Sequence, residues 1–118
     1  MPAKLYALGG ARLDSAEYAA DFASAEKFGP YRIGERAFYF REGLRQCCLP
    51  YADFDQVFRR AMLCSARHCG GVDNFDTFWL VFCREGEELC QAKTIDEKHA
   101  AAAYEALQRR LPGLKFGV

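Results

Sequence analysis

The most restrictive feature of this sequence is an almost unbroken apolar run at residues 76–83, centred on Phe78, Trp79, Leu80, Val81 and Phe82. So short a run, bounded by turn residues, is typical of a β-strand with both faces covered. Glu85-Gly86 follows as a turn, and residues 88–94 then complete a predicted hairpin. The fold must therefore supply a cover for each side of this strand.

Residues 95–111 are predicted to form a closing helix. Thr94 and Glu97 have the spacing of a capping box, and Arg109 and Arg110 lie in the last turn, as the helix dipole favours. One face is apolar at helical spacing and consists of Ala100, Ala103, Tyr104, Leu107 and Leu111. Because alanine permits close approach, we expect this helix to lie across an opening between strands.

A second helix is predicted for residues 14–28, with Asp14 or Ser15 as its cap and Gly29-Pro30 as its end. Residues 29–94 are predicted to be antiparallel strands joined by turns. Residues 65–74, which contain Gly70-Gly71 and Asp73-Asn74, are predicted to form the longest loop.

The chain has 118 residues and is 51% hydrophobic, so residues 1–118 are predicted to form a single domain that needs no disulfide or metal to fold. Its 16 basic residues balance its 16 acidic ones, which argues against nucleic acid as a partner. The first residues lack the sustained apolar stretch of a secretory signal, so we expect a cytoplasmic chain. The six cysteines are then expected to be reduced thiols, most of them serving as small hydrophobic residues.

Three stretches resemble the bacterial pleckstrin-homology-like (PH-like) families. They are residues 49–60 (LPYADF leading into VFRR), residues 78–82 with the turn at 85–86, and residues 111–117 after the last helix. The resemblance covers about residues 28–118. It implies an α+β fold, with a bent antiparallel β-barrel or sheet of about six to seven strands. The C-terminal helix would cap this barrel, and the N-terminal helix would be an addition to it.

The resemblance also implies a non-catalytic module, without a cofactor, that binds a protein, a peptide or a small ligand. Lipid-binding relatives gather basic residues in the loop between their first two strands. Here Arg32, Arg36 and Arg41 alternate with Glu35 and Glu42, so membrane lipid is not expected as the ligand.

Two groups of residues are candidates for binding. Arg59, Arg60, Arg67 and His68 concentrate positive charge within ten residues and suit an acidic peptide or a phosphate. The alternative is ion pairing with the flanking aspartates. Trp79 is the second candidate: if the N-terminal helix leaves its face of the strand uncovered, Trp79 would anchor a partner or a homodimer.

An alternative function rests on Cys64, His68 and Cys69, which place two thiols and an imidazole within six residues. This grouping suits a redox-active cysteine or part of a zinc site, although zinc normally takes four ligands. The sequence contains no phosphate-binding loop, nucleophile elbow or HExxH motif, so no enzyme activity is predicted.

Overall fold

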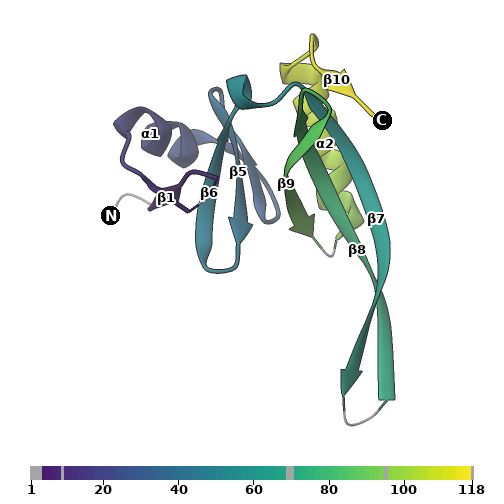
Figure 1. Cartoon of the computed structure of the whole chain (residues 1–118). Helices are drawn as coiled ribbons and strands as arrows, with labels where there is room; N and C mark the ends of the chain where they lie inside the picture. The colour runs from purple at the N-terminus through teal and green to yellow at the C-terminus, as the bar shows by residue number, and fades with distance from the viewer. Residues whose placement is uncertain (1–3, 9, 69–70, 95, 118) are drawn as a thin grey trace.

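The computed structural model describes residues 4–8, 10–68, 71–94 and 96–117, without the side chains of residues 62–76. The elements, in chain order, are β1 (Leu5–Tyr6), β2 (Arg12–Leu13), α1 (Ala16–Ser24), β3 (Glu26–Phe28), β4 (Tyr31–Ile33), β5 (Ala37–Glu42), β6 (Arg45–Pro50), a 3-10 turn (Tyr51–Asp53), β7 (Gln56–His68), β8 (Gly71–Arg84), β9 (Glu87–Thr94), α2 (Glu97–Arg110) and β10 (Lys115–Phe116). Figure 1 shows their arrangement.

The strands form two sheets, which confirms the α+β class. The six-stranded sheet has the order β2-β1-β6-β5-β4-β3, and the four-stranded sheet has the order β10-β7-β8-β9. The prediction of one barrel with six to seven antiparallel strands is wrong. The 3-10 turn separates β6 from β7, so the chain leaves one sheet and starts another.

Both sheets are also mixed, because β1 pairs with β6 and β10 pairs with β7 in parallel. The extra strands β1, β2, β3 and β10 have only two or three residues each. Segments that short cannot display an alternating pattern, which explains why the sequence did not reveal them.

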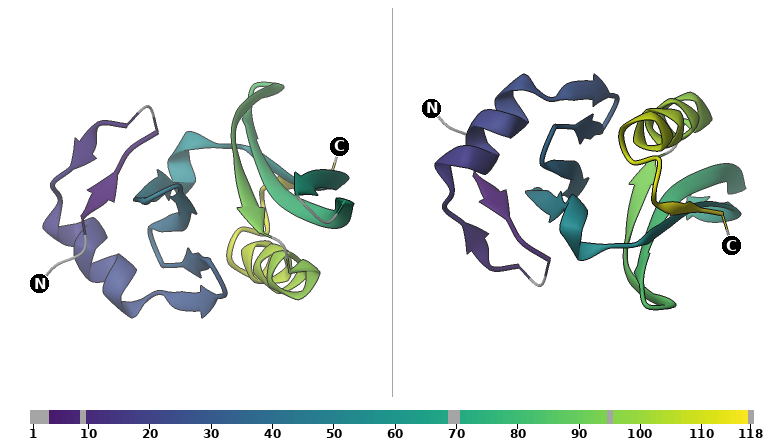
Figure 2. Two further views of the ribbon diagram at one scale, coloured as in Figure 1. Left: turned by 90° about the horizontal axis from the view of Figure 1, so that it is seen from below. Right: turned by 90° about the horizontal axis from the view of Figure 1, so that it is seen from above.

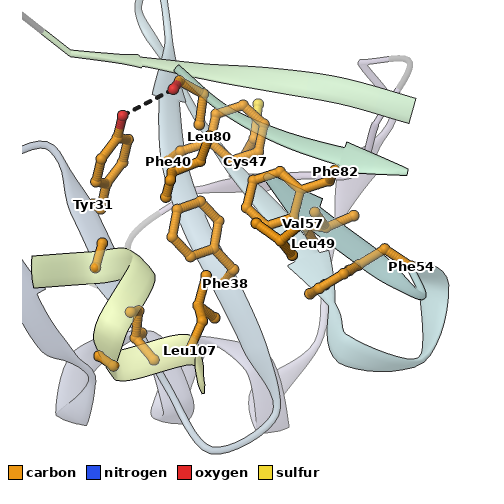
Figure 3. Packing of buried hydrophobic residues seen from close by; sticks show 14 residues of the cluster. Tyr31, Phe38, Phe40, Cys47, Leu49, Phe54, Val57, Leu80, Phe82 and Leu107 are labelled. Atoms are coloured by element: carbon orange, nitrogen blue, oxygen red, sulfur yellow. Dashed lines mark hydrogen bonds between the residues drawn. The ribbon is translucent and has the colours of Figure 1, made fainter. Parts of the chain in front are cut away.

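The main core lies between the two sheets and is closed by α2 (Figures 1 and 3). Phe38 of the six-stranded sheet packs against Phe82 of the four-stranded sheet, with ring centroids 4.8 Å apart and ring planes tilted by 41°. The Tyr31 hydroxyl donates a hydrogen bond of 2.8 Å to the carbonyl of Ala92 and joins the sheets at one side. Leu107 of α2 completes this core.

Helix α2 is two residues shorter at its start than the predicted 95–111. Asp96 is the N-cap, because its Oδ1 accepts a 2.9 Å hydrogen bond from the Lys98 amide. Thr94, the predicted cap, instead accepts a bond from the Asp96 amide. The predicted alanine face is confirmed, with Ala100 and Ala103 buried against the sheets.

Helix α1 covers the opposite side of the six-stranded sheet, so the two helices flank that sheet (Figure 2). It is shorter than the predicted 14–28, because residues 26–28 form β3 and pair with β4. Gly29, with φ of 59°, and Pro30 form the tight turn between these strands. A glycine followed by proline therefore makes a hairpin here and does not simply end a helix.

A buried carboxylate attaches α1 to the sheet. Asp21 is 7% exposed and accepts hydrogen bonds from the amides of Glu35 and Arg36 and from the Tyr39 hydroxyl, at 2.8, 3.1 and 2.7 Å. These donors lie on the β4–β5 turn and on β5. One side chain thus fixes the helix to two separate elements.

Strands β7 and β8 form a long hairpin that projects beyond the rest of the molecule (Figure 1). Its backbone ladder continues to the pair His68 and Gly71. The predicted loop at residues 65–74 is therefore wrong, apart from residues 69–70, which lie outside the described residues. Asp73 and Asn74 pair with Ala66 and Ser65 in the ladder, so strand pairing overrides their preference for turns.

Candidate functional site: the outer face of the four-stranded sheet

The four-stranded sheet has one face toward the core and one face away from it. Val57, Leu80, Phe82 and Ala92 belong to the core, so residues alternating with them point to the other side. We call this side the outer face; its residues with described side chains are Gln56, Phe58, Arg60, Thr77, Trp79, Val81, Cys83, Glu88, Gln91 and Lys93. Within the described part of the chain, both helices pack elsewhere: α1 on the six-stranded sheet and α2 on the core side.

Arg60 reaches across this face. It starts on β7, but its Nη1 donates a 3.0 Å hydrogen bond to Oε1 of Gln91 on β9, and its Nη2 pairs with Glu88 on the same strand. The guanidinium also lies 5.5 Å from the centre of the Phe58 ring. Because β8 lies between β7 and β9, the Arg60 side chain must pass over β8.

The position of the Arg60 side chain over β8 explains why two β8 residues on the outer face are buried. Val81 is 0% exposed and Cys83 is 4% exposed, although neither belongs to a core cluster. Arg60, together with the flanking Phe58 and Gln91, covers these two residues, on a side of the sheet where no described helix packs. The aliphatic part of an arginine often shields apolar surface in this way while its head stays hydrated.

Trp79 lies between two basic residues. It pairs with Arg60 on β7 and with Lys93 on β9, and its side chain is half-buried. Lys93 is exposed. An indole that is half-buried on an uncovered sheet face is a suitable anchor for another molecule, because much of its large apolar surface remains in water.

The structure separates the predicted basic cluster. Arg59 points to the core side, where its guanidinium lies 5.7 Å from the ring of Tyr104 on α2. Arg60 and Trp79, in contrast, are neighbours on the outer face. Arg67 and His68 lie on the far part of β7, whose side chains are outside the described residues. Consecutive arginines on a strand necessarily face opposite sides.

Sequence reasoning missed Glu88, Gln91 and Lys93. The predicted partners for Arg60 were nearby aspartates, but its observed acidic partner lies on β9. The available signal was the hairpin of residues 76–94, which places β9 beside Trp79. The β8–β9 pairing has a bulge between Phe82 and Cys83, which shifts the strand register. Simple alternation along the sequence therefore does not predict which β9 residues face outward.

Two of the three arginines that were compared with the basic loop of lipid-binding relatives have partners on the N-terminal helix. Arg32 donates a 3.1 Å hydrogen bond to the carbonyl of Phe22 and lies 4.0 Å from the centre of that ring. Arg36 lies 3.5 Å from Glu17 of α1. Both side chains contact residues of the N-terminal helix, so these two arginines do not form a common anion-binding site.

The proposed thiol cluster cannot be built from the described side chains. Cys64 and His68 lie on β7, where their backbones pair with Phe75 and Gly71, and Cys69 lies outside the described residues. Among the residues whose side chains are described, no three metal-ligating side chains lie together. The cysteine-dependent and zinc-binding alternatives therefore remain predictions.

The four cysteines whose side chains are described, Cys47, Cys48, Cys83 and Cys90, are free thiols in mainly apolar surroundings. Burial raises the pKa of both Cys48 and Cys90 to about 12, and it also raises the pKa of Cys47 and Cys83. A higher pKa leaves less thiolate at pH 8, and the thiolate is the reactive species. These four residues are suited to packing.

Thiol reactivity tests this assignment. In a variant carrying Cys64→Ser and Cys69→Ser, we expect the four remaining thiols to react with Ellman's reagent at pH 8 at least about tenfold more slowly than in denaturant. Fast reaction of the folded variant would contradict the structural role. Zinc bound by the wild type and lost in this variant would support the metal alternative.

Comparison of the chain with protein-family models, with curated proteins and with solved structures returns no match. Neither described helix is long and apolar enough to span a membrane.

Proposed function

We propose that this chain is a cytoplasmic, non-catalytic binding module of the PH-like kind, which recognises a protein or peptide through the outer face. Two features support the PH-like assignment. The core lies between two sheets, and the C-terminal helix closes it. The sequence stretches that suggest the resemblance lie at the passage between the sheets, on β8 and after α2.

The observation that carries the binding role is the half-buried Trp79 on β8, the middle strand of an outer face that no described helix packs against. On this face the Arg60 side chain lies over Val81 and Cys83 and shields them from water. A sheet face that is aromatic at its centre and charged at its edges has the composition of a protein-binding surface, in which aromatic and arginine side chains carry most of the affinity.

Site-specific cross-linking tests this role. We expect a photoreactive phenylalanine analogue at position 79, expressed in the host, to form an adduct with a specific partner that mass spectrometry identifies. Affinity for that purified partner should fall at least about 30-fold in Trp79→Ala, because a buried aromatic anchor contributes 2 kcal/mol or more.

Leu44→Ala provides the matched control. Leu44 is 99% exposed on the β5–β6 turn, on the other sheet, so its truncation removes a large apolar side chain away from the outer face. Its affinity for the partner should equal that of the wild type. Equal losses in both variants, or no adduct at position 79, would count against the outer face as the binding surface.

A further inference from the structure

Strand β7 has the longest free edge among the described strands. β10 pairs with this edge only at Gln56 and Val57, so in the described part of the chain the edge is open from residue 58 to residue 68. The strands at the other edges are short, as in β2, β3 and β10, or interrupted by a bulge, as in β9. Shortness and bulges are common protection against the addition of another strand, and β7 has neither.

Every second residue of β7 directs its backbone groups to this free edge. The carbonyl of Val57 accepts a 2.9 Å hydrogen bond from the amide of Gly117, so Val57 faces the side of β10. The direction of these groups alternates along a strand, and the β7–β8 register is regular over residues 56–68. The residues that face the edge beyond β10 are therefore Arg59, Ala61, Leu63, Ser65 and Arg67.

Most of the free edge belongs to a two-stranded arm, the projecting part of the β7–β8 hairpin (Figure 1). β9 pairs with β8 only as far as Thr94 and Phe78, so residues 62–68 of β7 and their partners have no third strand among the described residues. Two strands alone are marginally stable in water. A further strand would stabilise this arm.

The composition of the arm favours addition at β7. Residues 61–66 (AMLCSA) contain no charge, proline or glycine, which are the residue types that usually block the edge of a strand. Residues 71–77 of β8, at the other edge of the arm, contain Asp73 and Asp76. A strand can therefore add to β7 without placing an acidic residue of the arm at the new contact.

We propose that β7 pairs in antiparallel orientation with β7 of a second copy of this chain, so that the two arms form one continuous sheet. This interface is separate from the outer face of the proposed function. The edge is complementary to itself: in an antiparallel pair related by a two-fold axis, residues that face the edge lie opposite residues that also face it. The backbone alone thus supplies matching donors and acceptors.

The position of β10 limits the register of this pair. Because β10 and Gly117 occupy the edge as far as Val57, a second strand has room only from Arg59 onward. If the two-fold axis passes through Cys64, residues 60–68 of each copy pair with each other, and the second strand ends where β10 begins. An axis closer to β10 would make them overlap, and one farther away would shorten the ladder.

Charge supports the same register. An axis at Leu63 would place Arg59 directly opposite Arg67 at two symmetric positions, and like charges opposite each other destabilise a strand pair. With the axis at Cys64, Ala61 lies opposite Arg67, and Leu63 lies opposite Ser65. These pairs and their symmetry equivalents give about eight hydrogen bonds between the copies.

A proline substitution tests the edge by sedimentation equilibrium of the full chain. Leu63→Pro removes an amide that faces the edge and keeps the amides that pair with β8. Because one hydrogen bond is lost from each copy, the dimer should weaken at least about tenfold.

Asn74→Pro is the matched control. Asn74 pairs with Ser65 in the β7–β8 ladder, so its amide faces the opposite free edge of the same arm. The substitution makes the same backbone change in the arm without touching the proposed interface. Its dimer affinity should equal that of the wild type, and so should that of Trp79→Ala, which tests the outer face.

Oxidation of Cys64 tests the register without altering the backbone of β7. On the axis, Cys64 forms a non-hydrogen-bonded pair with its own copy, in which Cα atoms lie about 4.5 Å apart, a separation that a disulfide spans. In the Cys69→Ser chain, diamide should accept two electrons and two protons from the two Cys64 thiols and leave a disulfide between the copies. The covalent dimer should appear on a non-reducing gel and be absent when Cys64→Ser is added.

Three results would contradict the proposal. A monomeric wild type at the highest soluble concentration would overturn the dimer. A wild-type dimer that Leu63→Pro leaves unchanged would overturn the β7 edge as its interface. A dimer that is sensitive to Leu63→Pro but forms no Cys64 disulfide would overturn the register centred on Cys64.

Discussion

Replacing Asp21 with alanine will lower the free energy of unfolding by about 3 to 5 kcal/mol, because three donors lose their common acceptor in a buried site. The amides of Glu35 and Arg36 and the hydroxyl of Tyr39 would be left without this partner. Denaturant unfolding, followed by circular dichroism, measures the loss as a lower midpoint at an unchanged slope.

Glu17→Ala is the control for this substitution. Glu17 lies on the same helix and also pairs with Arg36, but both side chains are exposed and their interaction is screened by solvent. We expect a change within about 0.5 kcal/mol. A loss in Asp21→Ala no larger than that of Glu17→Ala would show that the buried carboxylate does not hold α1 in place.

Replacing Gly34 with alanine will destabilise the chain by about 3 kcal/mol, because the new methyl group needs the space that Asp21 occupies. A Cβ at Gly34 would lie 2.1 Å from Oδ2 of Asp21 and 2.6 Å from its Cγ. The carboxylate must move, and its hydrogen bonds to the following turn are then lost. Denaturant unfolding again measures the effect.

The two substitutions should not be additive. In the Asp21→Ala background the obstruction is absent, so adding Gly34→Ala should cost less than about 1 kcal/mol, an interaction energy of about 2 kcal/mol. Gly113→Ala serves as the control, since a Cβ there meets nothing within 4 Å. Full additivity of the Asp21 and Gly34 losses would contradict the proposed steric contact.

Local signals predicted helix α2 and the hairpin of residues 76–94 well. The α2 segment combines cap residues, dipole-matched charges and an alanine face within one continuous stretch, and each of these acts over a few residues. The turn at Glu85-Gly86 is confirmed, with both residues at positive φ, as a tight hairpin turn requires. Features of this kind need no knowledge of distant contacts.

The candidate site was harder to predict because it depends on strand register. Arg60 and Trp79 are candidates from the sequence, but their proximity requires the β7–β8 ladder. The position of Glu88 and Lys93 on the same face requires the bulge at Leu89, which lies between them. A shift of one residue would turn Lys93 toward the core. The predicted cluster of Arg59 with Arg60 failed for the same reason, since neighbours on a strand face opposite sides.

The parallel pairings at both ends of the chain have a consequence for the kinetics of folding. Strand β1 pairs with β6 across about 40 residues, and β10 pairs with β7 across about 60. Contacts at such separations require large loops to close before they give any stabilisation, and proteins that depend on them fold slowly. The β4–β5–β6 and β7–β8–β9 meanders, which join neighbouring strands, are therefore expected to form first. The terminal strands β1 and β10 then add to sheets that already exist.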